Sequence, residues 1–310
     1  MSFDAVVGHE RPIRVLRRTL RSGRVPHAYL FWGPDGVGKE RVARAAARVL
    51  LCAAPEGLER AEGCGRCAGC RKAAAGSHPD LHLLAPSGNT VPVADVRALQ
   101  ERLAFQAFER GRKVAIIRDA FRMTREAANG LLKTLEEPPA GTHIFLLAHH
   151  RNQLLPTLVS RCQCLRFDPV AEEQVRRLLE ERGVEPGAAR SLAAAAGGCP
   201  GAVLGRDPEA LGRLEAEVAD LRARWPRMGV GDRFAASSRW AAEKDRLSER
   251  LEALERALRR ELREGGSGAA LDLLEALYRT RGLIDRNVNV QLALDALFLG
   301  VGQPGWEECR

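Results

Sequence analysis

A glycine-rich stretch from Gly33 to Glu40, with the sequence GPDGVGKE, restricts this chain more than any other feature. Loops of the pattern G-x-x-x-x-G-K-[ST] bind phosphate groups through backbone N–H groups and the lysine, and their Ser/Thr hydroxyl binds Mg²⁺. Gly33, Gly38 and Lys39 keep this pattern and Gly36 lies inside it, but Glu40 occupies the hydroxyl position. The stretch therefore predicts a phosphate-binding loop that lacks one magnesium ligand.

The residues on either side of this loop predict the context that such a loop requires, a strand before it and a helix after it. The apolar run Ala28–Trp32 is typical of a buried strand, and Lys39–Leu51 has the periodicity of a helix. Together these segments predict the fold of P-loop NTPases.

The rest of the first half alternates between apolar runs and helical patterns, which is typical of a mostly parallel sheet covered on both faces. Further strands are expected at Val114–Ile117, His143–Ala148 and Cys164–Phe167. Further helices are expected at Val93–Ala104 and Arg125–Leu135.

Strand patterns end after Asp168-Pro169, and the remaining chain predicts helices whose apolar stripes form the core of a bundle. These helices are expected at Ala171–Arg182, Pro186–Ala196, Pro208–Trp225, Phe234–Glu264, Ala269–Thr280 and Asn287–Leu299. Within Phe234–Glu264, Arg and Glu residues lie three and four positions apart. We expect them to form ion pairs along a solvent-exposed face of the helix.

The net charge of +8 and the pI of about 9.4 are typical of proteins that bind nucleic acid. Nearly all of the positive charge is arginine, so the bias of a GC-rich genome explains it equally well, and direct DNA contact stays open. No run approaches the ~18 consecutive apolar residues that a membrane span needs, and no charged and then apolar leader opens the sequence. We therefore expect a cytoplasmic protein without a membrane partner.

Four of the cysteines, Cys52, Cys64, Cys67 and Cys70, lie close together in the sequence. Four thiolates are the number that a closed, structural zinc site needs. The spacing C-x2-C-x2-C also begins a bacterial ferredoxin run, so an iron–sulfur cluster is the competing interpretation. That run needs a further cysteine shortly afterwards, and residues 71–79 contain none, so we expect structural zinc.

Five motifs follow one another in a fixed order. They are V-P-H-A-Y-L-F-W-G-P-D-G-V-G-K at 25–39, the cysteine cluster, A-A-N-G-L-L-K-T-L-E-E-P-P at 127–139, L-L-P-T-L-V-S-R-C-Q at 154–163 and G-G-C-P-G-A at 197–202. In this order the chain resembles the AAA+ subunits of the bacterial DNA polymerase III clamp loader, called tau/gamma and delta-prime. The resemblance is specific through about residue 205.

The resemblance implies an α/β fold class and an arrangement in three domains. An AAA+ P-loop NTPase-like domain with a parallel sheet is expected at 1–167, with an inserted zinc module at about 52–72. A helical lid is expected at 168–206 and an all-α collar for oligomerisation at 207–310.

The nucleotide site departs from active members of this group at several positions. Alignment with the family pattern places Arg118 where an Asp holds Mg²⁺, Asp119 at the catalytic Glu, and His149 where a small hydroxyl residue senses the γ-phosphate. Gly197–Ala202 lacks the arginine of active lids, and Glu40 replaces the loop hydroxyl. A guanidinium cannot bind a cation. The departures favour a delta-prime type without ATPase activity or bound Mg²⁺, and they leave ATP binding open.

Glu40 and Arg118 replace two groups that face the same Mg²⁺ in active relatives, and their charges are opposite. We therefore expect a buried ion pair between them in the place of the metal.

The motif Ser160-Arg161-Cys162 keeps the arginine that, in this family, projects into the nucleotide site of the neighbouring subunit. The resemblance assigns Arg161 as an arginine finger that acts in trans.

Other marked residues receive no catalytic role. The pair Glu136-Glu137 is expected to serve packing and subunit contact, and no chemistry is expected of His27 or His78. Asn129 and Lys133 lie on one helical face and are candidates for interface roles.

The resemblance implies a non-hydrolysing subunit of a hetero-oligomeric loader within the DNA polymerase III holoenzyme. Its expected partners are the tau/gamma and delta subunits and, through the complex, the sliding clamp and primer–template DNA. The alternative is an ATP-hydrolysing, tau/gamma-like motor subunit. A stand-alone P-loop kinase or GTPase lacks support, because no small-substrate site is visible in the sequence.

Overall fold

The computed structural model describes residues 2–54, 56–109, 111–265, 268–285 and 288–300. The chain forms two compact units. The first comprises Met1–Val175 with Gly198–Ala202, and the second comprises Arg176–Gly197 with Val203–Arg310. The division into three domains that the sequence suggests stays a prediction.

The first unit is built on a five-stranded sheet with the strand order β2-β3-β4-β1-β5. All four neighbouring pairs of strands are parallel, which confirms the expected parallel α/β sheet. The strands are β1 (Ala28–Trp32), β2 (Leu81–Leu84), β3 (Lys113–Ile117), β4 (Thr142–Ala148) and β5 (Gln163–Arg166).

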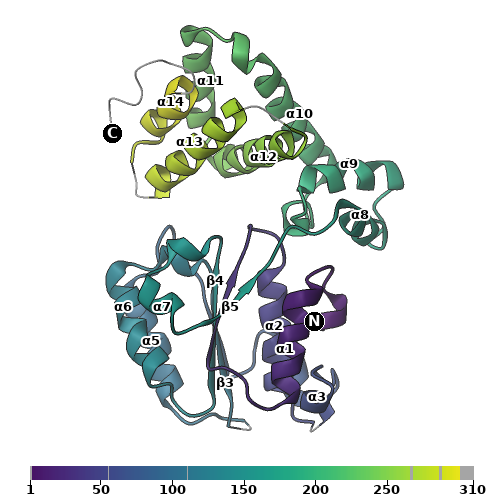
Figure 1. The fold of residues 1–310 in the computed structure, drawn as a ribbon, viewed down its shortest axis with the longest axis vertical. Helices are drawn as coiled ribbons and strands as arrows, with labels where there is room; N and C mark the ends of the chain where they lie inside the picture. The colour runs from purple at the N-terminus through teal and green to yellow at the C-terminus, as the bar shows by residue number, and fades with distance from the viewer. Residues whose placement is uncertain (1, 55, 110, 266–267, 286–287, 301–310) are drawn as a thin grey trace. The chain divides into compact units, whose positions relative to one another are not determined.

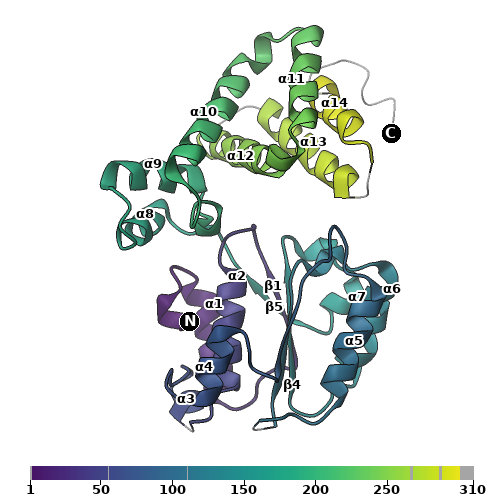
Figure 2. The same ribbon diagram turned by 180° about the vertical axis from the view of Figure 1, so that it is seen from behind.

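Helices cover both faces of this sheet, as Figures 1 and 2 show from opposite sides. One face carries α1 (Glu10–Arg21), α2 (Lys39–Leu50), α3 (Glu56–Glu59) and α4 (Ala68–Ala75). The other carries α5 (Val93–Ala104), α6 (Arg125–Glu136) and α7 (Pro156–Val159).

Alternate strand residues enter the two apolar layers, because successive side chains of a strand point to opposite faces. In β1, Tyr29 and Phe31 join the layer beneath α1 and α2, whereas Ala28 and Leu30 join the layer beneath α5 and α6. The central strands are buried on both sides, which explains their continuous apolar sequences.

The second unit is a helical bundle around one apolar core that includes Trp225, Trp240 and Phe298. Helix α8 (Glu172–Glu180) crosses from the first unit into the second. The other helices are α9 (Pro186–Ala196), α10 (Pro208–Arg224), α11 (Val230–Ala242), α12 (Lys244–Arg263), α13 (Gly268–Asp285) and α14 (Val290–Gly300). Short 3₁₀ helices are Phe3–Ala5, Ala120–Arg122, Arg151–Gln153, Pro200–Ala202 and Trp225–Arg227.

The single helix predicted over Phe234–Glu264 is wrong, because the chain forms α11 and α12 with a break at Glu243. Separate packing explains the break: α11 lies against α14, and α12 lies against α10 and α13. The Arg and Glu residues of α12 also reach other helices, since Arg256 pairs with Glu215 of α10 at 2.7 Å.

Helix α1 and strand β2 lie outside the sequence prediction. Strand β2 is short and pairs only with β3, so it shows little of the continuous apolar pattern of a central strand. Asn287, where the last predicted helix begins, lies outside the described residues. Among the described residues, no helix combines the length and the apolar character that crossing a membrane requires.

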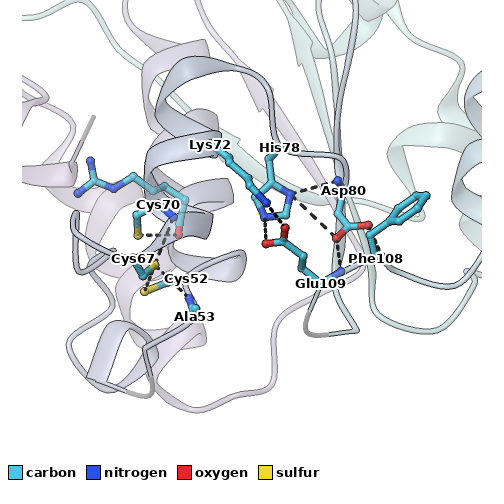
Figure 3. A network of polar contacts seen from close by, with 10 residues as sticks. Cys52, Ala53, Cys67, Cys70, Lys72, His78, Asp80, Phe108 and Glu109 are labelled. Carbon is cyan, nitrogen blue, oxygen red and sulfur yellow. Dashed lines mark hydrogen bonds and ion pairs between the residues drawn. The ribbon is translucent and has the colours of Figure 1, made fainter.

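Asp80 holds the loop that follows α5 against the amino end of β2. Its carboxylate is 2 % exposed and accepts hydrogen bonds from the backbone N–H groups of Phe108 and Glu109, each at 2.8 Å. Glu109 in turn pairs with Lys72 of α4 and lies 3.4 Å from Nε2 of His78 (Figure 3). Burial lowers the pKa of His78, and its Nδ1 accepts from the backbone of Asp80.

We expect Asp80→Ala to lower the free energy of unfolding by about 2 kcal/mol, because two backbone donors lose a charged acceptor. Urea denaturation followed by circular dichroism measures this change. The control is Glu101→Ala on the exposed side of α5, which removes the same charge without a hydrogen bond. A loss at Asp80 no larger than at Glu101 would show that the network has no stabilising role.

Candidate functional site

The residues of the predicted nucleotide site meet at one edge of the sheet. Strands β1, β3 and β4 are parallel neighbours, so their carboxyl ends lie at the same edge. The predicted site residues all follow these three strands, and they are Gly33, Gly36, Gly38, Lys39, Glu40, Arg118, Asp119 and His149. Open parallel sheets bind their ligands at this edge.

Glycines are required where the loop passes close to other backbone. A Cβ atom built on Gly33 would lie 2.1 Å from the carbonyl oxygen of Phe167, which no side chain allows. Gly38 begins α2 with a φ of 115°, a conformation that other residues rarely adopt. The loop motif is therefore a backbone requirement, independent of any bound phosphate.

Lys39 is directed into its own loop. Its side chain is buried, and Nζ donates hydrogen bonds to the carbonyl oxygens of Gly33 at 2.7 Å and Pro34 at 2.6 Å. Burial lowers the pKa of this lysine, and the charges of Asp35, Cys199 and Asp119 oppose the shift. The cation that binds phosphate in active P-loops is thus bound here by loop carbonyls.

Glu40 and Arg118 form the ion pair that the sequence predicts. The distance from Nε of Arg118 to Oε2 of Glu40 is 3.2 Å, and Arg44 binds the second oxygen, Oε1, at 2.8 Å. The prediction of a buried pair is wrong, because the side chains of Arg118 and Glu40 are 46 % and 30 % exposed. The sequence analysis missed Arg44, although its position four residues after Glu40 on the same helix was a usable signal.

Asp119 and His149 lie together beside this pair. Asp119 has the left-handed φ of 44°, and its carboxylate lies 3.7 Å from Nε2 of His149. The interaction with His149 is the main reason that the pKa of Asp119 is lowered, against the opposing effect of burial. The His149 ring also packs on Phe121, with ring centroids 4.8 Å apart.

Two further segments close around the loop. The backbone N–H of Gly201 donates to the carbonyl of Gly36 at 2.8 Å, so the G-G-C-P-G-A segment rests on the loop. On another side, Nε2 of His9 lies 2.8 Å from the carbonyl oxygen of Val37, and burial lowers the pKa of His9. No signal in the sequence singled out His9, because its partner is a backbone atom far along the chain.

Arg161 lies at the other edge of the sheet. It comes two residues before β5, which is parallel to β1, and therefore near the amino ends of the strands. Its guanidinium binds Glu136 at the end of α6 at 2.5 Å and donates to the carbonyl of Thr157 at 2.9 Å. The structure does not bring Arg161 together with the loop residues of its own chain.

The remaining marked residues of α6 are exposed. Asn129 and Lys133 share one turn on the solvent side of the helix, and Glu137 follows its last residue. This position is open to a partner, and their interface role stays a prediction.

The four cysteines form a cluster on the α2 side of the sheet. Their sulfur atoms all lie within 4.8 Å of one another, with Cys52 to Cys67 at 3.9 Å and Cys64 to Cys70 at 4.0 Å. Figure 3 shows Cys67 and Cys70 on the turn into α4, opposite Cys52 after α2. Zn–S bonds of about 2.3 Å in a tetrahedron need sulfurs at such separations, so the residues fit a metal ion.

Backbone donors and burial act differently on the thiols. The N–H groups of Cys70 and Ala53 point at the sulfur of Cys67 at 3.3 and 3.4 Å. Burial by itself raises the pKa of Cys67. The hydrogen bonds to its sulfur outweigh burial and lower this pKa to about 6. Burial raises the pKa of Cys70 to about 12.

Arg48 of α2 lies against this cluster. Its Nε is buried without a hydrogen-bond partner among the described residues. A Cβ atom built on Gly63 would lie 2.7 Å from this Nε and 3.1 Å from the sulfur of Cys70, so the two atoms border the same small space. Arg48 also donates to the carbonyl of Gly63 at 3.1 Å.

Comparison with known proteins identifies relatives among the subunits of DNA polymerase III. The sequence model of the family described as "DNA polymerase III, delta subunit" matches residues 8–171, more than half of the chain. DNA polymerase III subunit delta' of Bacillus subtilis is 40% identical over 184 residues, which cover 59% of this chain and 54% of that protein. The Escherichia coli subunit delta' is 40% identical over 187 residues, which cover 59% and 55%.

Subunits named tau are also similar. DNA polymerase III subunit tau of Escherichia coli is 40% identical over 206 residues, which cover 64% of this chain and 31% of that protein. The chain spans about half the length of the delta' proteins it matches. A solved structure of a gamma subunit-related protein from Thermotoga maritima is 19% identical and covers 93% of this chain and 97% of that one, with a TM-score of 0.47.

We expect the Glu40–Arg118 pair to contribute no more than about 1 kcal/mol to folding, because both groups are partly exposed. A double-mutant cycle with Glu40→Gln and Arg118→Gln, measured by urea denaturation, gives the coupling energy. The matched cycle on the exposed pair Arg213 and Glu209 serves as the control. A coupling above about 2 kcal/mol at the Glu40 pair would contradict this expectation.

Proposed function

Because the chain belongs to the DNA polymerase III delta subunit family, we propose that it is a non-hydrolysing AAA+ subunit of the clamp loader. In this role it helps to place the ring-shaped sliding clamp on primed DNA, within the DNA polymerase III holoenzyme. Its partners are the tau/gamma and delta subunits, in a hetero-oligomer in the cytoplasm. The delta' proteins of two organisms, each 40% identical, support this assignment.

The ion pair between Glu40 and Arg118 is the observation that carries the non-hydrolysing role. Phosphoryl transfer in P-loop enzymes depends on Mg²⁺ bound by the loop hydroxyl and an acidic side chain. Here the two replacements neutralise each other, and the Arg118 guanidinium repels a cation. Lys39, which would bind the phosphates, is held by loop carbonyls instead.

The competing function is an ATP-hydrolysing motor of the tau/gamma type. Sequence identity does not distinguish a delta' type from a tau type, because the tau protein of Escherichia coli is also 40% identical to this chain. The site residues favour the non-hydrolysing subunit, because a motor needs an intact magnesium site. Steady-state ATP hydrolysis by the isolated chain distinguishes them, and turnover by this chain would establish the motor.

The position of Arg161 supports an arginine finger that acts in trans. It lies near the amino ends of the strands, away from its own loop, and its side chain is 35 % exposed. A neighbouring subunit with an intact site presents a γ-phosphate on which charge develops during transfer. The bond to Glu136 would hold the finger until that phosphate replaces the carboxylate.

The cysteine cluster fits structural zinc. Four sulfurs fill all positions of a tetrahedral site and leave none for water, so the metal would supply folding energy and no chemistry. A zinc ion with four thiolates has two excess negative charges. The unpartnered Nε–H of Arg48 borders the same small space as the Cys70 sulfur, so its positive charge would offset part of this negative charge.

We expect purified protein to contain one zinc ion per chain, and Arg48→Gln to weaken zinc binding about 10–100-fold. Competition with a chromophoric zinc chelator measures the affinity, and elemental analysis identifies the metal. Arg60→Gln is the control, because it removes the same charge from an exposed position near the cluster. Iron in the protein would establish the competing cluster, and equal affinities of the two variants would remove the role of Arg48.

We expect Arg161→Ala to leave the chain folded and able to join the loader, because the side chain is partly exposed and belongs to no apolar core. It should also lower clamp- and DNA-stimulated ATP hydrolysis by the assembled loader. Trans-acting arginines contribute about 10³–10⁵ in rate at single sites, and several active sites in one loader dilute the loss. Turnover of a loader reconstituted with this variant measures the effect.

Two matched variants make this test specific. Arg125→Ala removes an exposed arginine from the first turn of α6 and should leave stimulated turnover unchanged. Arg161→Lys keeps the charge without the planar fork of donors, and should recover only part of the rate. Full turnover with Arg161→Ala would show that the finger assignment is wrong.

A further inference from the structure

The outer face of α1 carries a row of arginines. Arg11, Arg14, Arg18 and Arg21 follow one another at spacings of three, four and three residues, and all four are exposed. Such spacings place side chains on one side of a helix. The opposite side is buried against the sheet layer and includes Ile13, Leu16 and Leu20. We call these four residues the α1 arginine row.

None of the four has an ion-pair partner among the residues that the structure describes. Their neighbour Arg17 differs, since it binds Asp4 at 2.5 Å and Glu62 at 3.3 Å. Arginines of α12 are also paired, for example Arg250, which lies 3.0 Å from Glu217. Abundant arginine in the composition therefore does not by itself produce a row of unpaired charges.

The row has opposing effects on the helix that carries it. Like charges three and four residues apart destabilise a helix by about 0.2–0.5 kcal/mol per pair. Arg11 lies near the start of α1, where the helix dipole disfavours a positive charge, whereas Arg18 and Arg21 lie in the last turn, where the dipole favours one. These small opposing effects do not explain why all four arginines lie on one exposed face.

We propose that the α1 arginine row binds the phosphate backbone of nucleic acid. With a rise of 1.5 Å per residue, Arg11 to Arg21 spans about 15 Å. One strand of duplex DNA has a phosphate every 3.4 Å along its axis, so about four phosphates face the four arginines. A shallow groove of about 870 Å³ beside the helix is lined by four arginines and two acidic residues, among others: Arg14, Arg17, Arg18, Arg21, Asp4 and Glu10.

The chemistry of the row favours a phosphate chain over an acidic protein. Protein interfaces have an apolar centre with a polar rim. No large apolar side chain of α1 is among the exposed ones in the described residues. Arginine is also the side chain whose planar donors match phosphate oxygens. This binding would be a property of the chain itself and does not depend on the arginine finger or the loader.

Fluorescence anisotropy of the full chain with a labelled 20-base-pair duplex and a labelled 20-nucleotide single strand tests the proposal. Arg14→Gln with Arg18→Gln should weaken duplex binding about 10–100-fold at 0.1 M salt. It should also reduce the slope of log K against log salt by about two, because two phosphate contacts are lost. The single-strand arm shows which form of the backbone the row prefers.

The control is Arg213→Gln with Arg224→Gln on α10, which removes the same charge from exposed arginines that are paired with carboxylates. Both double variants should keep the thermal stability of the unchanged protein. Equal binding by the two variants would overturn the proposal, as would an unchanged chain that binds neither strand form at 0.05 M salt. Displacement of the duplex by polyglutamate of equal length as effectively as by unlabelled DNA would instead indicate an acidic protein partner.

Discussion

The parallel pairing of β1 with β4 on one side and β5 on the other is the constraint on which the first unit depends. It places the glycine-rich loop beside the end of β4, and it places the segment before β5 at the opposite edge. The same pairing brings the backbone of Phe167 so close to Gly33 that only glycine is accommodated there. The pairing of β1 with β4 and β5 therefore positions both the predicted nucleotide-site residues and, at the opposite edge, Arg161.

Several charged side chains at the carboxyl ends of these strands are paired with other groups of the chain. Lys39 is bound by loop carbonyls, and Glu40 is shared between Arg44 and Arg118. The Asp119 carboxylate lies 3.7 Å from Nε2 of His149. These charged side chains therefore all have partners within the chain, and this pairing is the basis on which we propose a subunit without ATP hydrolysis.

Arginine side chains have different kinds of neighbours in other parts of the chain. In the second unit, arginines of α12 connect helices through carboxylates, as Arg256 does with Glu215. At the cysteine cluster, one unpartnered guanidinium nitrogen borders a group of four thiols. On α1, a row of exposed arginines has no carboxylate partner in the described residues, although Arg21 donates to the carbonyl of Arg60 at 3.3 Å. The same residue type therefore serves packing in one place and is available for binding in another.

The sequence by itself determined what depends on short spacings. The loop motif, the helix over Val93–Ala104 and the turn that presents Cys67 and Cys70 are local, so the order of residues specifies them. The charges of Glu40 and Arg118 also indicated their pairing, through comparison with a known pattern.

Tertiary structure alone decided what depends on distant parts of the chain. It placed His9 on the glycine-rich loop and left both side chains of the Glu40–Arg118 pair partly exposed. It also ended helix α11 and began α12 at Glu243, within a continuous helical pattern. It also formed β2, whose single partner strand supplies the hydrogen bonds that its own sequence did not reveal. These features arise from packing between elements, and periodicity along one segment carries no information about its neighbours in space.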